Sequence, residues 1–411
     1  MQRAAQRIVE KLRAHGHEAF FAGGWVRDFL LRRKPKDIDI ATSAHPEEVI
    51  RLFPKSLAIG AQFGVIQVLM YGHPYEVATF RSDNPYFDGR RPSSVEFSGP
   101  EQDAYRRDFT INGLFYDPLA DRLIDYVHGK ADIQNRIIRT IGIPKDRFTE
   151  DKLRMMRAIR FACSLSFEIV PETWEAIRLL SPEILQISWE RIRDELLKIL
   201  IGPSPARGLD LLHESGILVH ILPEIAPGQS QTELLNNAKT ALGALRNPSA
   251  VVALSVLLQG TEKSGGERAR LICRRLRMSN EEAARIVDLI TSQGSFSHAK
   301  DLRGADLRRL LNKPDIHDHL ELHRANCISI RGGLDNYWFC LNKLNEFASS
   351  PVAEPFIGGE DLIKMGYSPG PIFKEILRTV EDLQLEGAIQ TREEAIEHVR
   401  TFFPLTNKFN L

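Results

Sequence analysis

The sequence predicts an α+β protein, in which an N-terminal part of alternating strands and helices precedes a long all-helical part. Two observations support this fold class. Short apolar runs of the kind that form strands lie in the first part of the chain, and glycines and prolines end them. From about Thr149 onward helical periodicity takes over and strand signals nearly vanish. A chain of 411 residues exceeds what one hydrophobic core usually serves, so we expect about two to four structural units.

Turn-forming residues mark the ends of the elements expected in the first part. The expected elements are a helix over residues 1 to about 15, a strand in HEAFFAGG that ends at Gly23-Gly24, a helix in WVRDFLL, a strand in KDIDIAT, a helix in HPEEVIRLF with Pro46 in its first turn, and a hairpin in FGVIQVLMYGHPYEVATF with a Gly-His-Pro turn. Amphipathic segments separated by loops such as GPSPARG and GTEKSGGE predict that the remainder is helical.

The stretch KDIDIAT alternates two aspartates with two isoleucines. In a strand, Ile38 and Ile40 share one face, and Asp37 and Asp39 share the other. The two carboxylates repel each other unless a proton is shared or cations lie between them, and a divalent-metal site needs this arrangement. The heptapeptide alone fits an edge strand with a solvated face equally well.

Three further features surround this pair. Gly23-Gly24 separate a strand from a helix, where backbone N–H groups and the helix N-terminus can hold a phosphate. Arg27 follows one turn later and can clamp the same phosphate, although it also fits a solvated helix face. Glu76, in the β-type run YEVATFR, lies on the face opposite Tyr75 and can join the aspartate pair from a neighbouring strand. Together these features suggest two-metal nucleotidyl transfer, for which Mg²⁺ suits the all-oxygen ligands.

The composition is that of an ordinary soluble protein, with 43% hydrophobic and 26% charged residues. No apolar run approaches the roughly 20 residues that span a bilayer, and the N-terminus lacks the apolar core of a secretory signal, so we expect no membrane span and a cytoplasmic location. Lys+Arg and Asp+Glu both total 54, so only local patches can attract a polyanion. The 4 cysteines are far apart without CxxC pairing, which disfavours a zinc site and a disulfide framework.

GGWVRDFLL followed by KDIDIAT resembles the head-domain signature of the class II nucleotidyltransferases of the DNA polymerase β superfamily, the family of bacterial CCA-adding enzymes and poly(A) polymerases. Further matches follow in the family's order over residues 20 to about 165. YEVATFR and YFDGRRPSSVEFS resemble the third-carboxylate strand and the flexible loop, RRDFTINGLFYDP the ribose-sensing motif, DYVHGKADI the head-to-neck hinge, and RFTEDKLRMMRAIRFA the amino-acid template that pairs with the incoming base. IGGEDLIKMGYSPGPIFKEIL resembles the C-terminal segment of many tRNA-maturing members.

The resemblance implies a polymerase-β-like head with a small mixed β-sheet, followed by an all-α neck, body and tail. The implied divisions are a catalytic head over 1–140, a base-recognising neck over 141–206, an RNA-binding body over 207–320 and a tRNA-binding tail over 321–411. The implied activity is template-independent addition of CCA to the tRNA 3′ end from CTP and ATP, with release of pyrophosphate, Mg²⁺ as cofactor and no protein partner. The implied catalytic carboxylates are Asp37, Asp39 and Glu76, and the implied metal ligands are Asp37 and Asp39.

The same resemblance assigns the nucleotide-binding residues, and their chemistry agrees with the assignment. Arg107, Asp108 and Asn112 supply one cation and two groups that can hydrogen-bond the 2′-hydroxyl of ribose. Asp151 can accept from the exocyclic amine that C and A share, and Arg154 can donate to ring nitrogens and carbonyls. The implied nucleotide-binding set is Gly23, Gly24, Arg27, Arg107, Asp108, Asn112, Asp151, Arg154, Arg157 and Arg160.

The template segment is expected to form one amphipathic helix. Thr149 is its expected N-cap, and Glu150 and Asp151 complement the dipole of its first turn. Charged residues then step by three from Asp151 to Arg160 along one side. The expected apolar face consists of Leu153, Met156, Ile159 and Cys163. In an arbitrary protein, an ordinary helix with a charged outer face would be the better explanation.

Two observations concern the helical part. Some relatives carry a metal-dependent HD phosphohydrolase domain with an LLHD sequence, but the corresponding helix here has Gln259 and Gly260 in ALSVLLQGTEK, so we expect no second hydrolase site. The Arg/Lys-rich stretches 266–279 and 300–313 can track RNA phosphates, although charge runs are more often solvated faces.

Several functions remain open at this point. Poly(A) polymerases share the head and neck almost motif for motif, but the tail segment and the lack of a long basic C-terminal extension favour CCA addition. The uninterrupted TFRSDNPYFDGRRPSSVEFS resembles the loop that switches from C to A, which counts against addition of CC only but not of A only. A catalytically inactive RNA-binding protein and a small-molecule nucleotidyltransferase would leave several of these motifs unexplained.

Overall fold

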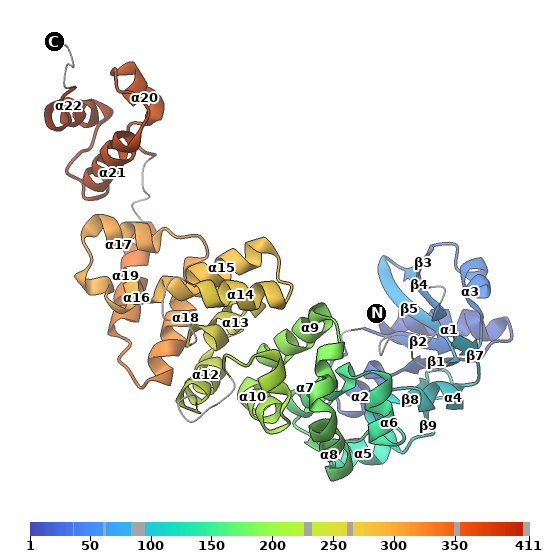
Figure 1. Ribbon diagram of the computed structural model, residues 1–411. Helices are drawn as coiled ribbons and strands as arrows, with labels where there is room; N and C mark the ends of the chain where they lie inside the picture. Colours follow the sequence, from blue (N-terminus) through green and yellow to red (C-terminus); the bar gives the residue numbers. More distant parts are fainter. Residues whose placement is uncertain are drawn as a thin grey trace. The chain divides into compact units, whose positions relative to one another are not determined.

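The computed structural model describes residues 1–35, 37–60, 63–83, 95–225, 232–260, 266–348 and 354–405 (Figure 1). The chain divides into two compact units, one of Met1–Lys239 with Leu271–Ser279 and the other of Thr240–Arg270 with Asn280–Leu411. The first unit therefore contains both the predicted head and the predicted neck. Most of the predicted flexible loop YFDGRRPSSVEFS lies outside the described residues.

A mixed sheet forms the centre of the first unit. Its described strands follow the order β3-β4-β5-β2-β1-β8-β9, in which β2 and β5 pair parallel and the other neighbours pair antiparallel. The prediction of a small mixed sheet is confirmed. The strands are β1 (Ala19–Ala22), β2 (Asp39–Thr42), β3 (Ser56–Gly60), β4 (Val65–Met70), β5 (His73–Thr79), β8 (Leu114–Asp117) and β9 (Arg122–Asp125), and a separate pair consists of β6 (Arg81–Asp83) and β7 (Val95–Phe97).

Helices α1 and α3 cover one face of this sheet, because α1 contacts β1 and β2 while α3 contacts β4 and β5 (Figure 1). The Tyr75 hydroxyl donates to the Met1 carbonyl over 2.9 Å, which places the buried side of β5 against the start of α1. Glu76 therefore points to the other face, as predicted. The helices of this region are α1 (Gln2–Ala14), α2 (Gly24–Leu30), α3 (Pro46–Leu52), α4 (Pro100–Tyr105), η2 (Thr110–Asn112) and α5 (Gly129–Asn135).

Two local predictions in the head need correction. Strand β2 begins at Asp39, so Asp37 precedes the strand, although Ile38 and Ile40 are buried as predicted. The turn between β4 and β5 is Tyr71-Gly72 and not Gly-His-Pro, since Met70 pairs directly with His73. Both turn residues have positive φ, 50° and 78°. A two-residue turn of this kind matches the twist of the flanking strands.

The hinge motif DYVHGKADI has a steric reason for its glycine. A Cβ added to Gly129 would lie 2.1 Å from the Thr110 carbonyl oxygen, so only glycine lets α5 approach η2 this closely. The Thr110 hydroxyl also donates to the Asp132 carboxylate over 2.7 Å. This packing supports the ribose-sensing segment from behind.

The predicted neck is helical apart from one short parallel pair, β10 (Ile137–Ile138) and β11 (Glu168–Ile169). Helix α7 packs against α9 and α10, and α6 packs against α8. The helices from here to the end of the first unit are α6 (Pro144–Glu150), α7 (Leu153–Leu165), α8 (Pro171–Leu180), η3 (Ser181–Gln186), α9 (Trp189–Leu200), α10 (Pro205–Glu214) and α11 (Ile217–Ile221).

The template segment is not one helix, and the prediction of Thr149 as its N-cap is wrong. Helix α6 ends at Glu150, Asp151 is extended with φ −145° and ψ 103°, and α7 begins at Leu153. The Asp151 carboxylate accepts from the Leu153 N–H over 3.1 Å, so aspartate competes with the helical hydrogen-bond pattern and separates the two helices. The expected apolar face of α7 is confirmed by the burial of Leu153, Met156, Ile159 and Cys163.

The second unit is helical throughout its described residues. Its helices, with α12 and α14 shared between the units, are α12 (Thr232–Ala244), α13 (Ala250–Gln259), α14 (Glu267–Arg275), α15 (Asn280–Thr291), α16 (Gln293–Ser297), η4 (Ala299–Asp301), α17 (Gly304–Leu311), α18 (Ile316–Ser329), α19 (Asp335–Ala348), α20 (Gly359–Lys364), α21 (Pro371–Leu385) and α22 (Arg392–Phe402). Gln259 does not face a metal site: its side-chain amide exchanges hydrogen bonds with that of Asn326. Among the described helices, none is long and apolar enough to cross a membrane.

Candidate active site

The three predicted carboxylates meet on one side of the sheet. Because Ile40 of β2 pairs with Val77 of the parallel strand β5, Asp39 and Glu76 lie beside each other on the opposite face from these buried side chains. Asp37, exposed and two residues before Asp39, extends the same side of the chain. The geometry therefore brings together the set expected from the sequence.

The pKa of Asp39 reflects the closeness of these three carboxylates. Burial and the neighbouring charges of Asp37 and Glu76 together raise the pKa of Asp39 to about 6, while Arg107 opposes the shift. Like charges in a partly desolvated site favour a shared proton or a bound cation. Within the described ranges, no three His, Cys, Asp or Glu side chains form a ready-made metal cluster.

Gly23 begins the phosphate-binding turn predicted between strand and helix. It has φ 63° and precedes α2, and an added Cβ would lie 2.9 Å from the Arg107 guanidinium. Glycine is therefore required both by the backbone conformation and by the approach of Arg107. Gly24 has ordinary space around it, with its nearest contact 3.7 Å away at Arg27.

A buried aspartate that sequence reasoning missed holds two arginines at this turn. Asp103 is 1% exposed, and its carboxylate accepts from Arg106 over 2.8 Å and from Arg107 over 2.9 and 3.1 Å. Burial alone would raise the pKa of Asp103, but Arg107 and Arg106 outweigh it and lower the pKa. The spacing could have indicated these contacts, because Asp103 precedes Arg106 and Arg107 by three and four residues near the end of α4.

Two of the residues predicted to sense ribose, Asn112 and Asp108, belong to a continuous hydrogen-bonded chain from α2 to α7. Arg27 donates to the Asn112 side chain over 2.8 Å, and Asn112 donates to Asp108 over 3.1 Å. Arg157 then donates to the second Asp108 oxygen through two nitrogens, over 2.9 and 2.5 Å. Burial opposes ionisation of Asp108, but the charge of Arg157 and the hydrogen bond from Asn112 hold its pKa well below the usual range.

The two predicted base-reading residues lie at the junction of α6 and α7, but they do not pair with each other. Asp151 forms an ion pair with Arg191 of α9 over 2.7 Å. Arg154, with only 8% of its side chain exposed, pairs with Glu150 over 2.7 Å and donates to the Arg147 carbonyl over 3.1 Å. Asp151 is thus held by Arg191, and Arg154 by Glu150. The sequence did not indicate these two holding roles.

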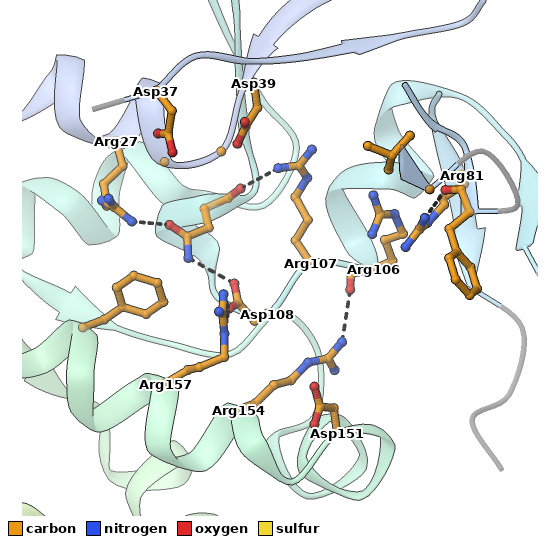
Figure 2. A pocket seen from close by; sticks show the side chains of 17 residues that line it. Arg27, Asp37, Asp39, Arg81, Arg106, Arg107, Asp108, Asp151, Arg154 and Arg157 are labelled. Atoms are coloured by element: carbon orange, nitrogen blue, oxygen red, sulfur yellow. Dashed lines mark hydrogen bonds and ion pairs between the residues drawn. The ribbon is translucent and has the colours of Figure 1, made fainter. Parts of the chain in front are cut away.

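A cavity of about 680 Å³ collects these groups, and Figure 2 shows Asp37 and Asp39 on one side of it and Asp151 and Arg154 on the other. The lining residues are Gly23, Gly24, Arg27, Asp37, Asp39, Gly60, Phe63, Val65, Arg81, Arg106, Arg107, Asp108, Asn112, Asp151, Arg154, Arg157 and Phe161. Six arginines against four aspartates give the described lining an excess of positive charge. Such a lining suits a polyphosphate.

Two predicted site residues lie outside this lining. Glu76 adjoins Asp39 on the sheet but does not reach the cavity, and Arg160 pairs with the buried Glu195 over 2.6 Å. Arg160 also lies over the Phe161 ring, 4.1 Å from its centre. The residues that line the cavity without having been predicted are Gly60, Phe63, Val65, Arg81, Arg106 and Phe161.

The two basic stretches are largely neutralised inside the chain. In the first, Arg275 forms two hydrogen bonds with Glu224, over 2.8 and 2.7 Å. In the second, Arg309 pairs with Glu381 and Asp382, and Lys313 pairs with Asp288 over 2.5 Å. Their proposed contacts with RNA stay a prediction.

Comparison with known proteins agrees with this site. The family described as "Poly A polymerase head domain" matches residues 19–139, and "Probable RNA and SrmB- binding site of polymerase A" matches residues 166–228. A CCA-adding enzyme from Geobacillus sp. (strain WCH70) is 36% identical over 407 residues, covering 95% of this chain and 94% of the relative. One from Streptococcus pneumoniae (strain ATCC BAA-255 / R6) is 35% identical over 391 residues, with the same coverage.

A solved structure extends the similarity to the whole chain. The Bacillus stearothermophilus CCA-adding enzyme in complex with CTP has a TM-score of 0.81 and 31% identity, covering 98% of both chains. The fold and the site therefore define a class II nucleotidyltransferase of the DNA polymerase β superfamily. Within this class, the chain belongs to the family of CCA-adding enzymes.

We predict that Arg157→Met destabilises the protein by about 1–3 kcal/mol, because it leaves the buried Asp108 carboxylate without its cation. The matched control is Arg178→Met, which removes an exposed ion pair with Glu175 and should change stability by no more than about 0.5 kcal/mol. Urea unfolding monitored by circular dichroism measures both. Equal effects of the two substitutions would contradict the importance of the Asp108–Arg157 pair.

The same pair gives this prediction a pH dependence. Because the pKa of Asp108 is lower in the folded protein than its ordinary value of 3.8, its stabilisation is complete above about pH 4 and declines as the pH falls below that value. In Arg157→Met the main cause of the lowered pKa is removed. When the pH is lowered from about 5 to about 3, the free energy of unfolding should therefore fall less in the variant than in the wild type.

Proposed function

We propose that this protein completes the CCA end of tRNA, adding nucleotides from CTP and ATP to the RNA 3′ end without a nucleic-acid template and releasing pyrophosphate. The observation that carries the proposal is the cavity itself. It combines two carboxylates at the start of β2, arginines around a glycine turn, and the side chains of Asp151 and Arg154 on the neck. The printed name of the relatives and the solved complex with CTP support the same activity.

The triphosphate would lie against the glycine turn. The Gly23 turn leaves room there, and Arg27, Arg106 and Arg107 supply guanidinium groups whose direction is fixed by Asp28, Asp103 and Asn112. Guanidinium groups held in advance lose little freedom when they meet phosphate oxygens. The arginines would therefore bind and orient the leaving pyrophosphate.

The carboxylates fit Mg²⁺. Asp37 and Asp39 offer hard oxygen ligands, and burial together with the charges of Asp37 and Glu76 raises the pKa of Asp39, which a bound cation would oppose. Mg²⁺ commonly takes one or two carboxylates from the protein and completes its shell with phosphate oxygens and water. When bound, the ion would lower the pKa of the attacking 3′-hydroxyl and neutralise charge on the triphosphate.

Ribose discrimination would rest on Arg107 and Asn112, with Asp103 positioning Arg107 and Asp108 positioning Asn112. Asp108 already accepts four hydrogen bonds, from the Phe109 N–H, from Asn112 and twice from Arg157, and four fill the acceptor sites of a carboxylate. We therefore assign the contact with the 2′-hydroxyl to the amide of Asn112 and the guanidinium of Arg107. This refines the role expected from the sequence for Asp108.

Base selection would come from Asp151 and Arg154. Cytosine and adenine both present an amine donor beside a ring-nitrogen acceptor, which an aspartate and an arginine side by side complement. Guanine and uracil present the reverse order. Both side chains are held by partners outside the base-reading edge, Arg191 and Glu150, so the wrong base meets donors and acceptors that cannot turn to suit it.

The remaining assignments belong to the same proposal. It assigns catalysis to residues 1–140, base recognition to 141–206, RNA binding to 207–320 and tRNA binding to 321–411, of which the first two ranges belong to the first unit. Arg160, whose guanidinium pairs with Glu195, would act through Phe161 and not by contact with the nucleotide. The cytoplasmic location stays a prediction.

The function is tested with tRNA transcripts that end before CC, after one C and after CC, each offered CTP, ATP, UTP or GTP separately. We expect addition of C to the first two and of A to the third, and a finished CCA end after a mixture of CTP and ATP. Electrophoresis at single-nucleotide resolution measures the products. Long A tails on unrelated RNA would support poly(A) polymerase instead. Extension of the third transcript alone would indicate an A-only enzyme, and extension of the first two alone would indicate a CC-only enzyme.

Asp37→Asn and Asp39→Asn should each reduce the rate of addition by roughly a thousand-fold or more, because each removes a charged metal ligand while the isoleucines of β2 still pack. Binding of tRNA, measured by gel shift, should stay within about threefold of the wild type. Asp194→Asn, at a half-exposed ion pair outside the cavity, is the matched control. A wild-type rate of nucleotide addition in Asp39→Asn would contradict the assignment of Asp39 as a metal ligand.

Arg154→Ala and Asp151→Ala should damage choice as well as rate. Arg154→Ala leaves Glu150 without its ion-pair partner, and Asp151→Ala leaves Arg191 without its partner. Each variant also leaves one edge of the base unsatisfied, so incorporation of UTP or GTP relative to CTP should rise by roughly tenfold or more. Competition assays with paired triphosphates measure this ratio. If both variants kept wild-type selectivity and only lost stability, the junction of α6 and α7 would be a structural element and not a template.

A further inference from the structure

Large apolar side chains are exposed on the outer strands of the head sheet. Leu57 of the edge strand β3 is 64% exposed, and Leu69 of β4 is 47% exposed. Ile59 of β3 is also exposed, at 56%. Exposing several such residues on neighbouring strands costs solvation free energy and is typical of a surface that binds something.

The strand register places this surface on the catalytic face. Leu57 pairs with Gln67, and Gln67 pairs with Glu76, so these three side chains point the same way across β3, β4 and β5. Leu69 follows Gln67 by two residues and shares its face. We name Leu57, Gln67 and Leu69 the β3–β4 face.

The β3–β4 face is continuous with the cavity. Val65 precedes Gln67 by two residues on the same face of β4, and Val65 lines the cavity. Neighbouring strands lie about 4.8 Å apart, so Leu57 is roughly 10 Å from Glu76 across the sheet. A nucleotide whose 3′-hydroxyl reached the carboxylates would therefore extend over this face.

The opposite face of the same strands is closed. Ile66, Val68 and Val77 are fully buried there, where α3 contacts β4 and β5. On the catalytic face, a cluster that includes Phe80, Ala104 and Val127 covers the sheet near β1 and β8. Among the described residues of this face, the open apolar area thus lies on the outer strands, beside Glu76.

The reaction requires two substrates to meet at the carboxylates. The arginine-lined cavity suits the triphosphate of the incoming nucleotide, and the RNA must then approach from another side. The β3–β4 face carries two leucines and one amide and no charge of its own. It therefore suits the flat faces of bases and ribose more than phosphates, and the Gln67 amide can hydrogen-bond either.

We propose that the β3–β4 face binds the base and ribose of the last nucleotides at the RNA 3′ end and positions the attacking hydroxyl beside Asp39 and Glu76. The inference rests on the proposed function, to which it adds the path of the acceptor strand. The other occupant that an apolar edge strand invites is a second copy of this chain, paired through β3. The experiment below separates the two.

Leu57→Ser and Leu69→Ser are compared with Leu179→Ser, a control on α8 whose leucine is also 64% exposed. We expect the KM for tRNA ending before CC to rise roughly five- to tenfold in the first two variants, with the KM for CTP within about twofold of the wild type. The control should match the wild type in both constants. This split separates a positioning role from a general loss of folding.

A second measurement uses the wild-type protein and so does not depend on the folding of any variant. A tRNA with 4-thiouridine as its last nucleotide should crosslink under near-ultraviolet light to the peptide over 56–70, mapped by mass spectrometry. Unchanged KM for tRNA together with crosslinks elsewhere would overturn the proposal. A change in sedimentation coefficient on Leu57→Ser, with unchanged KM, would assign the face to self-association. Failure of the wild type to extend any tRNA would overturn the proposed function itself.

Discussion

The ion pair between Asp108 and Arg157 is the contact on which the geometry of the active site depends. Asp108 follows α4 in the head and is 9% exposed, while Arg157 lies in α7 of the neck. Removing either partner would leave a charge that burial makes costly, so the two elements stay together. Arg147 strengthens the same joint by donating to the carbonyl of Arg107 over 2.9 Å. One wall of the cavity comes from the head and the other from the neck, and the Asp108–Arg157 ion pair sets the distance between these walls.

Buried carboxylates have a common role around the cavity, since each holds arginines that face the substrate. Asp103 holds Arg106 and Arg107, and Asp108 holds Arg157. A guanidinium that already donates two hydrogen bonds keeps its direction when the triphosphate arrives, which favours electrostatic stabilisation that needs little rearrangement. Asp39 has the opposite balance, because its pKa is raised by burial and by its acidic neighbours. The protein thus pairs Asp103 and Asp108 with arginines that they orient, whereas at Asp39 burial and acidic neighbours outweigh the nearby charge of Arg107.

Local patterns were sufficient to predict much of the fold, and tertiary contacts explain the rest. Alternation identified the buried Ile38 and Ile40 and the outward direction of Glu76, because a strand has a fixed period of two.

The break at Asp151 was missed, since the apolar periodicity of α7 continues smoothly into the charged residues before it. Arg191, which holds Asp151, lies 40 residues away in the sequence, and no local pattern reports such a distance. The direction of Arg160 toward Glu195 was likewise set by packing between α7 and α9. The sequence therefore predicted most of the residues that line the described cavity but not how they hold one another.

The way in which Asp151 is held limits what the neck can recognise. One carboxylate oxygen accepts from the Leu153 N–H at the start of α7, and the other meets Arg191, so the group is fixed in direction. Arg154 is fixed by Glu150 and by backbone carbonyls in the same way. A rigid acceptor beside a rigid donor distinguishes C and A from G and U, because the order of donor and acceptor is reversed in the second group. It does not distinguish C from A, whose edges present the same order. In the proposed function, the choice between them would come from the size of the space beside Asp151 and Arg154, and that space would depend on how far the RNA 3′ end extends toward Asp39 and Glu76. The proposals for base selection and for the position of the acceptor strand are therefore coupled.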